Sequence, residues 1–272
     1  MKVVGKAKSF AFQYKKFDES FFPMYTGNDI DRYYLNWNGL FCCRDKEKIM
    51  SYGATDIRLR DESIFCKEKI LLRKTGNRII STIDYKNRYY EQSLFSFSLI
   101  SKNYNLKFIL AILNSKIANF LFNNNPFSKK DTFPQIRLHW LKDFPIISTT
   151  PDNQLRFIQA VDLMLNLNSD LKNKSDNFIN RLKSNFNIKK IISRLSQFFE
   201  YDFKDVMIEL KKQNINLSLK QQDEWQDYFN DYKQKITDLK GQIDQTDREI
   251  DQMVYELYGL TPEEIEIVEK ST

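Results

Sequence analysis

The sequence predicts an α+β fold in two parts, a mixed α/β part over residues 1–147 and a mainly α-helical part over residues 148–272. Short apolar runs separated by turn residues fill the first part, whereas long runs with helical spacing fill the second. The net charge also changes sign between them. The first part holds 25 Lys and Arg against 14 Asp and Glu, a net +11, and the second holds 17 against 22, a net −5.

The composition is that of a globular protein. Of the 272 residues, 42% are hydrophobic and 29% are charged. The apolar runs are too short to span a membrane, and no apolar segment follows the first lysines as a signal peptide requires. Three cysteines without a C-x-x-C pair, with a single histidine, cannot supply a zinc site. We therefore expect a cytoplasmic protein with reduced thiols, no membrane association, no metal and no cofactor.

The segment "ILLRKTGNRIISTI", residues 70–83, predicts a β-hairpin whose Gly-Asn loop suits a tight type II′ turn. In that register Leu72 pairs with Ser81, and Thr75 pairs with Arg78. The better core face is then formed by Ile70, Leu72, Ile79 and Ile83. Arg73 and Arg78 would emerge together on the other face, near the turn, because side chains alternate across a strand.

A buried amphipathic helix is predicted next, capped by Asn105 and reaching Leu121 without a break. The loop-rich stretch "NNNPFSKKDTFPQIRLHWLKDFPI" follows. It carries two Phe-Pro dipeptides together with cations, amides and hydroxyls. The first part of the chain is therefore a mixed α/β domain with basic and polar loops.

Beyond Thr150, a plausible helix cap ahead of Pro151, the pattern is helical almost throughout. Two heptad series lie four residues apart; they are Phe229, Ile236, Ile243, Ile250 and Leu257, and Trp225, Tyr232, Leu239, Thr246 and Met253. This predicts a long coiled-coil-like helix of roughly 50 Å at about 1.5 Å per residue. We favour an antiparallel partner within the chain, such as the helix predicted over residues 155–171. The heptads also permit a homodimer through the C-terminal helices.

The last residues of the chain include capping residues typical of helix ends. Gly259 suits the position after a helix, and Thr261 with Glu264 forms a capping box around Pro262 for a short last helix.

Motifs for catalysis are missing from the sequence. The seven glycines are spread singly and form no cofactor-binding turn, and "NNPF" at 124–127 lacks the second proline and the preceding strand of an amino-methyltransferase motif. The carboxylates of "PEEIEIVEK" lie on a terminal helix, and no nucleophile is identifiable beside His139. We therefore expect that the chain is not an enzyme by itself.

Four motifs in order resemble the TaqI-like C-terminal specificity domain; they are "YTGNDIDRYY", "ILLRKTGNRIISTID", "LKFILAILNSKIANFLF" and "FPQIRLHWLKDFPI". That domain is the target-recognition region of type II restriction-modification enzymes, which fuse DNA methylation and cleavage. The tail, "LSLKQQDEWQDYFNDYKQKI" and then "DREIDQMVYELYGLTPEEIEIVE", resembles the helical segment that ends many of these enzymes. The resemblance covers nearly the whole chain.

The resemblance implies a DNA-binding specificity domain that enters the major groove and reads a short asymmetric site. It also implies methyltransferase and endonuclease domains or subunits as partners, since the catalytic parts lie upstream in the family. The chain would be either a fragment of such an enzyme or a separate subunit, equivalent to half of a type I specificity subunit with its spacer helix.

The residues that contact DNA must be inferred from their chemistry, because Arg and Lys read guanine, Asn and Gln read adenine, and phosphates accept from any cation or hydroxyl. The hairpin and the loop around the first Phe-Pro supply most candidates, and Arg32 is a weaker one. They are Arg32, Arg73, Lys74, Thr75, Asn77, Arg78, Lys129, Lys130, Thr132, Gln135 and Arg137. For each of them the alternative is a solvated surface residue.

Three alternatives to a DNA specificity module stay open at this point. The chain could be a helical interaction scaffold that binds a catalytic partner and has no DNA affinity of its own. It could be an enzyme whose site the motifs do not reveal. It could also bind RNA, although its aromatic residues are mostly spaced as core residues and not as stacking platforms.

Overall fold

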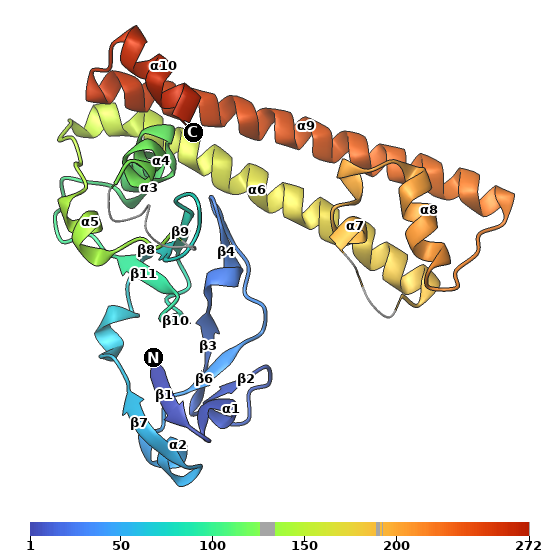
Figure 1. Cartoon of the computed structure of the whole chain (residues 1–272), viewed down its shortest axis with the longest axis horizontal. Coiled ribbons are helices and arrows are strands. Elements are labelled where there is room, and N and C mark those ends of the chain that lie inside the picture. The colour runs from blue at the N-terminus through green and yellow to red at the C-terminus, as the bar shows by residue number, and fades with distance from the viewer. Residues whose placement is uncertain (126–133, 189–190, 192, 272) are drawn as a thin grey trace. The chain divides into compact units, whose positions relative to one another are not determined.

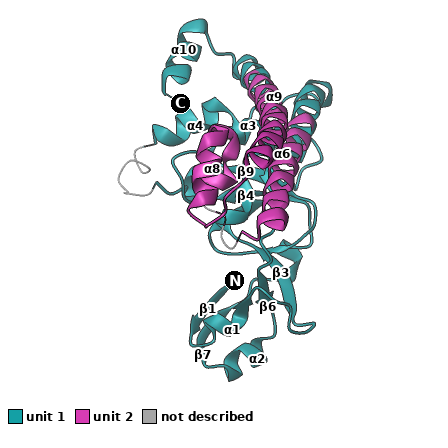
Figure 2. Cartoon of the chain, turned by 90° about the vertical axis from the view of Figure 1, so that its right-hand side faces the viewer, with its two compact units in different colours: residues 1–162, 249–272 teal, residues 163–248 magenta. Residues whose placement is uncertain are grey.

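The computed structural model describes residues 1–125, 134–188, 191 and 193–271, and it confirms the predicted α+β fold class. The chain forms two compact units (Figure 1 and Figure 2). Unit 1 comprises residues 1–162 and 249–272, and unit 2 comprises residues 163–248. The domain boundary at residue 147 stays a prediction.

All strands of the described chain lie in unit 1. They are β1 (Lys2–Gly5), β2 (Phe12–Gln13), β3 (Phe21–Tyr25), β4 (Ile30–Asp31), β5 (Tyr34–Leu35), β6 (Phe41–Cys43), β7 (Ala54–Arg58), β8 (Lys69–Arg73), β9 (Ser81–Asp84), β10 (Tyr89–Tyr90) and β11 (Leu94–Phe97).

Helices occur in both units, and two of them continue from one unit into the other. They are α1 (Lys8–Ala11), α2 (Lys46–Ser51), α3 (Leu106–Asn114), α4 (Lys116–Asn123), α5 (Leu138–Asp143), α6 (Pro151–Phe186), α7 (Ser193–Ser196), α8 (Phe203–Lys211), α9 (Leu219–Tyr258) and α10 (Pro262–Ser271). Short 3₁₀ turns are η1 (Gly27–Asp29), η2 (Glu62–Ile64) and η3 (Phe198–Glu200).

The sheets of unit 1 are small. One has the strand order β10-β3-β6-β2, another has the order β11-β8-β9, and β1 with β7 and β4 with β5 form two-stranded sheets. Among the strands that the structure describes, only the β10–β3 pair is parallel. Such short strands bury enough apolar area only by packing together, so the sheets share clusters of buried side chains.

Both faces of the β8–β9 hairpin are buried, which contradicts the prediction of one core face. On one face, Ser81 bonds to Asn114 of α3. On the other face, Leu71 and Ile80 join a buried cluster that includes Tyr25 of β3. The strands are covered on both sides, and a polar residue within them must therefore find a partner inside the protein.

Lys69 and Asp84 satisfy that requirement at the base of the hairpin. They are opposite each other in the β8–β9 register, their Nζ and Oδ2 atoms are 2.8 Å apart, and both side chains are fully buried. Lys69 also donates to the carbonyl of Phe65 (2.9 Å), and Asp84 accepts from the backbone N–H groups of Lys86 (2.8 Å) and Arg88 (3.0 Å). The buried charges are thus paired and hydrogen-bonded, as their desolvation requires.

The helix predicted from Asn105 to Leu121 is divided into α3 and α4, which meet at an angle of 56°. Asn105 caps α3 as predicted, by accepting from the N–H of Lys107. Ser115 ends α3 and caps α4, because its backbone is extended and its hydroxyl accepts from the N–H of Ala118. The N–H of Lys116 donates to a carboxylate oxygen of Asp251 (2.8 Å), which satisfies another group at the start of α4.

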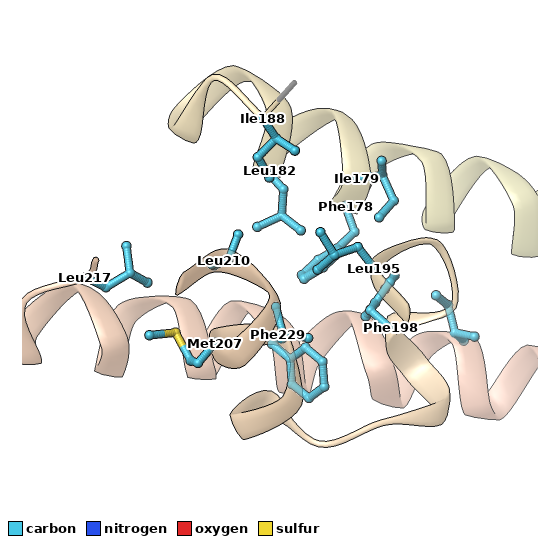
Figure 3. Packing of buried hydrophobic residues seen from close by; sticks show 12 residues of the cluster. Phe178, Ile179, Leu182, Ile188, Leu195, Phe198, Met207, Leu210, Leu217 and Phe229 are labelled. Atoms are coloured by element: carbon cyan, nitrogen blue, oxygen red, sulfur yellow. The ribbon is translucent and has the colours of Figure 1, made fainter. Parts of the chain in front are cut away.

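Unit 2 is built around a cluster of buried hydrophobic residues, which includes three phenylalanines (Figure 3). Phe178 of α6 is fully buried and stacks on Phe198, with ring centroids 3.8 Å apart. Phe178 also meets Tyr228, Phe229 and Tyr232 of α9 at centroid distances of 5.7–6.1 Å. One aromatic side chain therefore joins α6, the turn η3 and α9.

Within unit 2, α6 and α9 run antiparallel, as expected for a partner within the chain. Phe186 meets Trp225, and Phe178 meets Tyr232 further along α9. Every residue of the two heptad series is buried or half-buried, which includes the polar exception Thr246. The helical partner begins at Pro151 and ends at Phe186, and is thus longer than predicted.

The predicted helix ends are confirmed. Thr150 accepts from the N–H of Asn153 at the start of α6. Gly259 follows α9 with a φ of 67°, which glycine adopts without strain. Thr261 and Glu264 exchange the two hydrogen bonds of a capping box at the start of α10.

Within the described chain, no single helix has both the length and the apolar composition needed to cross a membrane. The bent pair α3–α4 meets that criterion only when the two helices are taken together, by length and composition alone.

We expect Lys69→Met to lower the free energy of unfolding by about 3–5 kcal/mol, because it leaves the buried Asp84 carboxylate without its cation. Urea denaturation followed by circular dichroism measures the change. Lys69→Met combined with Asp84→Asn removes the charge and should recover part of the loss. Lys67→Met, at an exposed lysine two residues away, is the matched control. Equal stability of Lys69→Met and the control would contradict this role of the ion pair.

We expect Phe178→Ala to lower the stability of unit 2 by about 3–5 kcal/mol, the usual cost of emptying a large aromatic site. Hydrogen exchange over residues 163–248 measures this directly. Leu163→Ala on the same helix is the control, because Leu163 is 46% exposed. Similar exchange in the two variants would show that the cluster does not hold unit 2 together.

Candidate nucleic-acid interface

The β8–β9 hairpin carries five of the eleven predicted DNA-contacting residues. The predicted register is confirmed by the pairing of Leu72 with Ser81 and by the hydrogen bond from the N–H of Arg73 to the carbonyl of Ile80 (3.0 Å). The hairpin is held at its base by Lys69 and Asp84. Its turn, residues 74–78, is called the hairpin tip below.

The predicted two-residue turn is wrong, because the hairpin tip pairs with another segment. Thr75 forms an antiparallel bridge with Gln135, where an Arg78 partner was expected. The N–H of Gly76 donates to the carbonyl of Pro134 (3.1 Å), and the N–H of Ile136 donates to the carbonyl of Lys74 (2.8 Å). Gly76 has a φ of 158°, far from the value near +60° of a type II′ turn.

This pairing brings together the two predicted clusters, one from the hairpin and one from the loop around the first Phe-Pro. Five of the predicted residues have exposed side chains at or beside the bridge; they are Thr75, Asn77, Arg78, Gln135 and Arg137. Arg137 precedes α5 directly. Lys129, Lys130 and Thr132 lie outside the described residues. The exposed set combines guanidinium, amide and hydroxyl groups, the chemistry that base edges and phosphates accept.

Lys74 lies at the edge of this set and is half-buried. Its ammonium nitrogen is 4.6 Å from the centroid of the Phe95 ring, a cation–π contact. Burial lowers the pKa of Lys74, and the positive charge of Arg60 lowers this pKa further. Lys74 is thus a partly buried cation at the edge of the exposed set.

Arg73 bonds to the neighbouring strand β4, and it is not exposed beside Arg78 as predicted. Its guanidinium donates to the carbonyl of Ile30 and lies 3.8 Å from a carboxylate oxygen of Asp31. The side chain is 25% exposed. Arg73 thus links β8 to β4, because the strand beside the hairpin offers it a carbonyl and a carboxylate.

Arg32 has a similar position between elements. It donates to the carbonyl of Asn114 at the end of α3 (2.8 Å), and its guanidinium carbon is 5.6 Å from the Tyr33 ring centroid. A cation at a helix C-terminus stabilises the exposed carbonyl groups there. Arg32 and Arg73 therefore both stabilise the framework behind the hairpin tip.

Two amides that the sequence analysis left inside a helix hold the return strand of the hairpin. Asn114 accepts from the N–H and the hydroxyl of Ser81 and donates back to the carbonyl of Ser81 (3.0 Å). Asn119 accepts from the N–H of Ile79 (2.7 Å) and donates to the carbonyl of Ser115 (3.0 Å). The Asn-Ser pair within an otherwise apolar helix was the available signal, since both residue types compete with the helical backbone for hydrogen bonds.

The described residues contain no group of three or more His, Cys, Asp or Glu side chains arranged to hold a metal ion.

Two family models match the chain. The TaqI-like C-terminal specificity domain matches residues 22–146, and a domain of unknown function (DUF8810) matches residues 150–254. A search of curated proteins gives no match. The first match confirms the resemblance over the part of the chain that contains the hairpin tip. The TaqI-like match ends at residue 146, and the resemblance of the helical part to the segment that ends many of those enzymes stays a prediction.

We expect Asn119→Ala to loosen the hairpin tip without unfolding unit 1, because the N–H of Ile79 loses its acceptor at a cost of about 1–3 kcal/mol. Amide hydrogen exchange at Ile79 and its neighbours should become faster. Asn124→Ala is the control, because among the described residues the side-chain amide of Asn124 donates only to the carbonyl of Phe120 in the helix that it caps. Unchanged exchange at Ile79 would exclude this anchoring role.

Proposed function

Because residues 22–146 form a TaqI-like C-terminal specificity domain, we propose that this chain reads a short duplex DNA site through the hairpin tip and the segment paired with it. The TaqI-like domain is a specificity module of restriction-modification enzymes and is not their catalytic part. The observation that carries the proposal is the Thr75–Gln135 bridge, which sets residues from two separate segments side by side.

The roles follow from the chemistry of each group. Arg78 can bond a guanine through two parallel hydrogen bonds, and Gln135 and Asn77 can do the same with an adenine. Thr75, Lys74 and Arg137 are suited to phosphates, which fix the position of the protein without reading sequence. Lys129, Lys130 and Thr132 belong to the same proposal through their place in the sequence, between α4 and the bridge.

Arg32 and Arg73 have a different part in the proposal. Both are bonded to backbone carbonyls of unit 1, and we assign them to positioning the strands under the hairpin tip. Such residues influence DNA binding indirectly, through the geometry of the groups that touch it.

The helical part would join this module to its catalytic partners. We propose that residues 148–272 act as a spacer that docks to methyltransferase or endonuclease domains or subunits in the cytoplasm, and that residues 1–147 supply the recognition domain. The long heptad-patterned helix α9 supports this division, because its apolar series are used within the chain and its remaining surface is charged. The alternative is a scaffold that binds a catalytic partner and has no DNA affinity.

Selection from a randomised duplex pool at two salt concentrations tests the proposal. We expect one short enriched motif and weaker binding at high salt, since cations that neutralise phosphates release counterions. Arg78→Ala and Gln135→Ala should each cost about 1–3 kcal/mol and relax the preference at one position of the motif. Lys102→Ala, at an exposed lysine away from the hairpin tip, is the matched control.

Two results would overturn the proposal. If the chain binds no duplex at low salt, yet binds a methyltransferase partner with little dependence on salt, the scaffold is the better description. If Arg78→Ala and Gln135→Ala leave the enriched motif unchanged, the reading surface lies elsewhere on the chain.

A further inference from the structure

A second group of cations gathers on the sheet formed by β1 and β7. Lys2 and Arg58 are opposite each other in its antiparallel register. Residues paired in this way lie on the same face of a sheet, where like charges repel and destabilise the pair. The carboxylate of Asp56 is shared between them, 3.8 Å from Lys2 Nζ and 3.3 Å from Arg58 Nε. One carboxylate thus faces two cations.

Arg60 adds a third cation two residues beyond Arg58. The N–H group Nη2 of Arg44 donates to the carbonyl of Arg60 (3.0 Å), which fixes the backbone there. The guanidinium of Arg60 itself has neither a hydrogen bond nor an ion pair to any residue of the described chain, and it is exposed. An unneutralised arginine beside other cations is electrostatically unfavourable in the free protein, and an anion relieves that cost.

The three cations line one hollow of about 150 Å³, which is called the basic cleft below. Glu91 and Gln92 lie on its other wall. Glu91 is the single carboxylate there, and it accepts from the hydroxyl of Ser93 (3.2 Å). The cleft is therefore net positive, and it has room for an anionic group together with ordered water.

The basic cleft adjoins the hairpin tip. Leu94, which lines the cleft, pairs with Arg73 in the β11–β8 register, and the N–H of Lys74 donates to the carbonyl of Ser93 (3.0 Å). The carbonyl of Lys74 in turn accepts a hydrogen bond from the N–H of Ile136, in the segment paired with the tip. A ligand that lies along the hairpin tip is thus close to the cleft.

We propose that the basic cleft of Lys2, Arg58 and Arg60 binds a phosphate group of the DNA backbone while the hairpin tip reads the bases. This inference rests on the proposed function. Arginine guanidiniums present parallel donors that match phosphate oxygens, which makes such a contact directional as well as attractive. The contact fixes where the duplex lies relative to Arg78 and Gln135, and it carries no sequence information of its own.

Arg60→Gln tests the inference, with Lys102→Gln as the matched control at another exposed cation of unit 1. The full chain is titrated with duplexes that contain and lack the enriched motif, over a range of salt concentrations. We expect Arg60→Gln to weaken binding to both duplexes by the same factor. The slope of log K against log[salt] should become shallower by about 1, the change for one lost phosphate. Arg78→Gln should instead weaken binding mainly to the motif duplex.

A second measurement separates the basic cleft from the proposed function. The midpoint of thermal unfolding is compared in inorganic phosphate and in chloride at equal ionic strength, for the wild-type chain and for Arg60→Gln. We expect phosphate to raise the midpoint of the wild type more than that of the variant, since exclusion of phosphate from the surface stabilises both chains and only an intact site adds a binding contribution.

The outcomes are distinguishable. Duplex binding with an affinity and salt slope unchanged by Arg60→Gln overturns the cleft and leaves the proposed function standing. Absence of duplex binding, with phosphate stabilisation that depends on Arg60, overturns the proposed function and the DNA assignment and retains a phosphate site. Absence of both overturns both proposals.

Discussion

The buried ion pair between Lys69 and Asp84 is the constraint on which the β8–β9 hairpin and its tip depend. Both charges lie where water does not reach, so each must find its partner and its hydrogen bonds in one arrangement of the strands. A shift of the hairpin by one residue would separate them and leave two unpaired charges in the interior. The pair therefore specifies the register of β8 and β9 more than it adds to stability. The position of the hairpin tip, at the other end of the two strands, is set by that register.

Local patterns predicted the parts of the fold that local chemistry decides. The hairpin register followed from turn residues and alternation, and the helix ends at Asn105, Thr150 and Gly259 followed from capping groups close in sequence. The antiparallel helix pair followed from the heptad series. In each of these cases the residues that decide the structure are neighbours along the chain or repeat with a fixed period.

The remaining features depend on partners far away in the sequence. The hairpin tip does not form a two-residue turn, because its backbone groups bond to residues 134–136. The sequence of the Gly-Asn loop gives no indication of that distant segment. The break at Ser115 depends on Asp251, 135 residues away. From the sequence, Arg73 is a basic residue expected to be exposed and to contact DNA. In the structure it bonds instead to a carbonyl and lies near a carboxylate of β4. The candidate site could thus be proposed from the sequence as a set of residue types, while the pairing that assembles it could not.

The hairpin tip is also held in a particular way. Its contacts to residues 134–136 run from backbone to backbone, and its return strand is held by amides that belong to α3 and α4. The exposed side chains of the tip contribute nothing to these bonds. In a surface fixed in this manner, the bonds that hold the backbone are independent of the exposed side chains. Substitutions at Thr75, Asn77, Arg78 and Gln135 would change the chemical groups that the surface exposes, while the backbone that positions them stays the same.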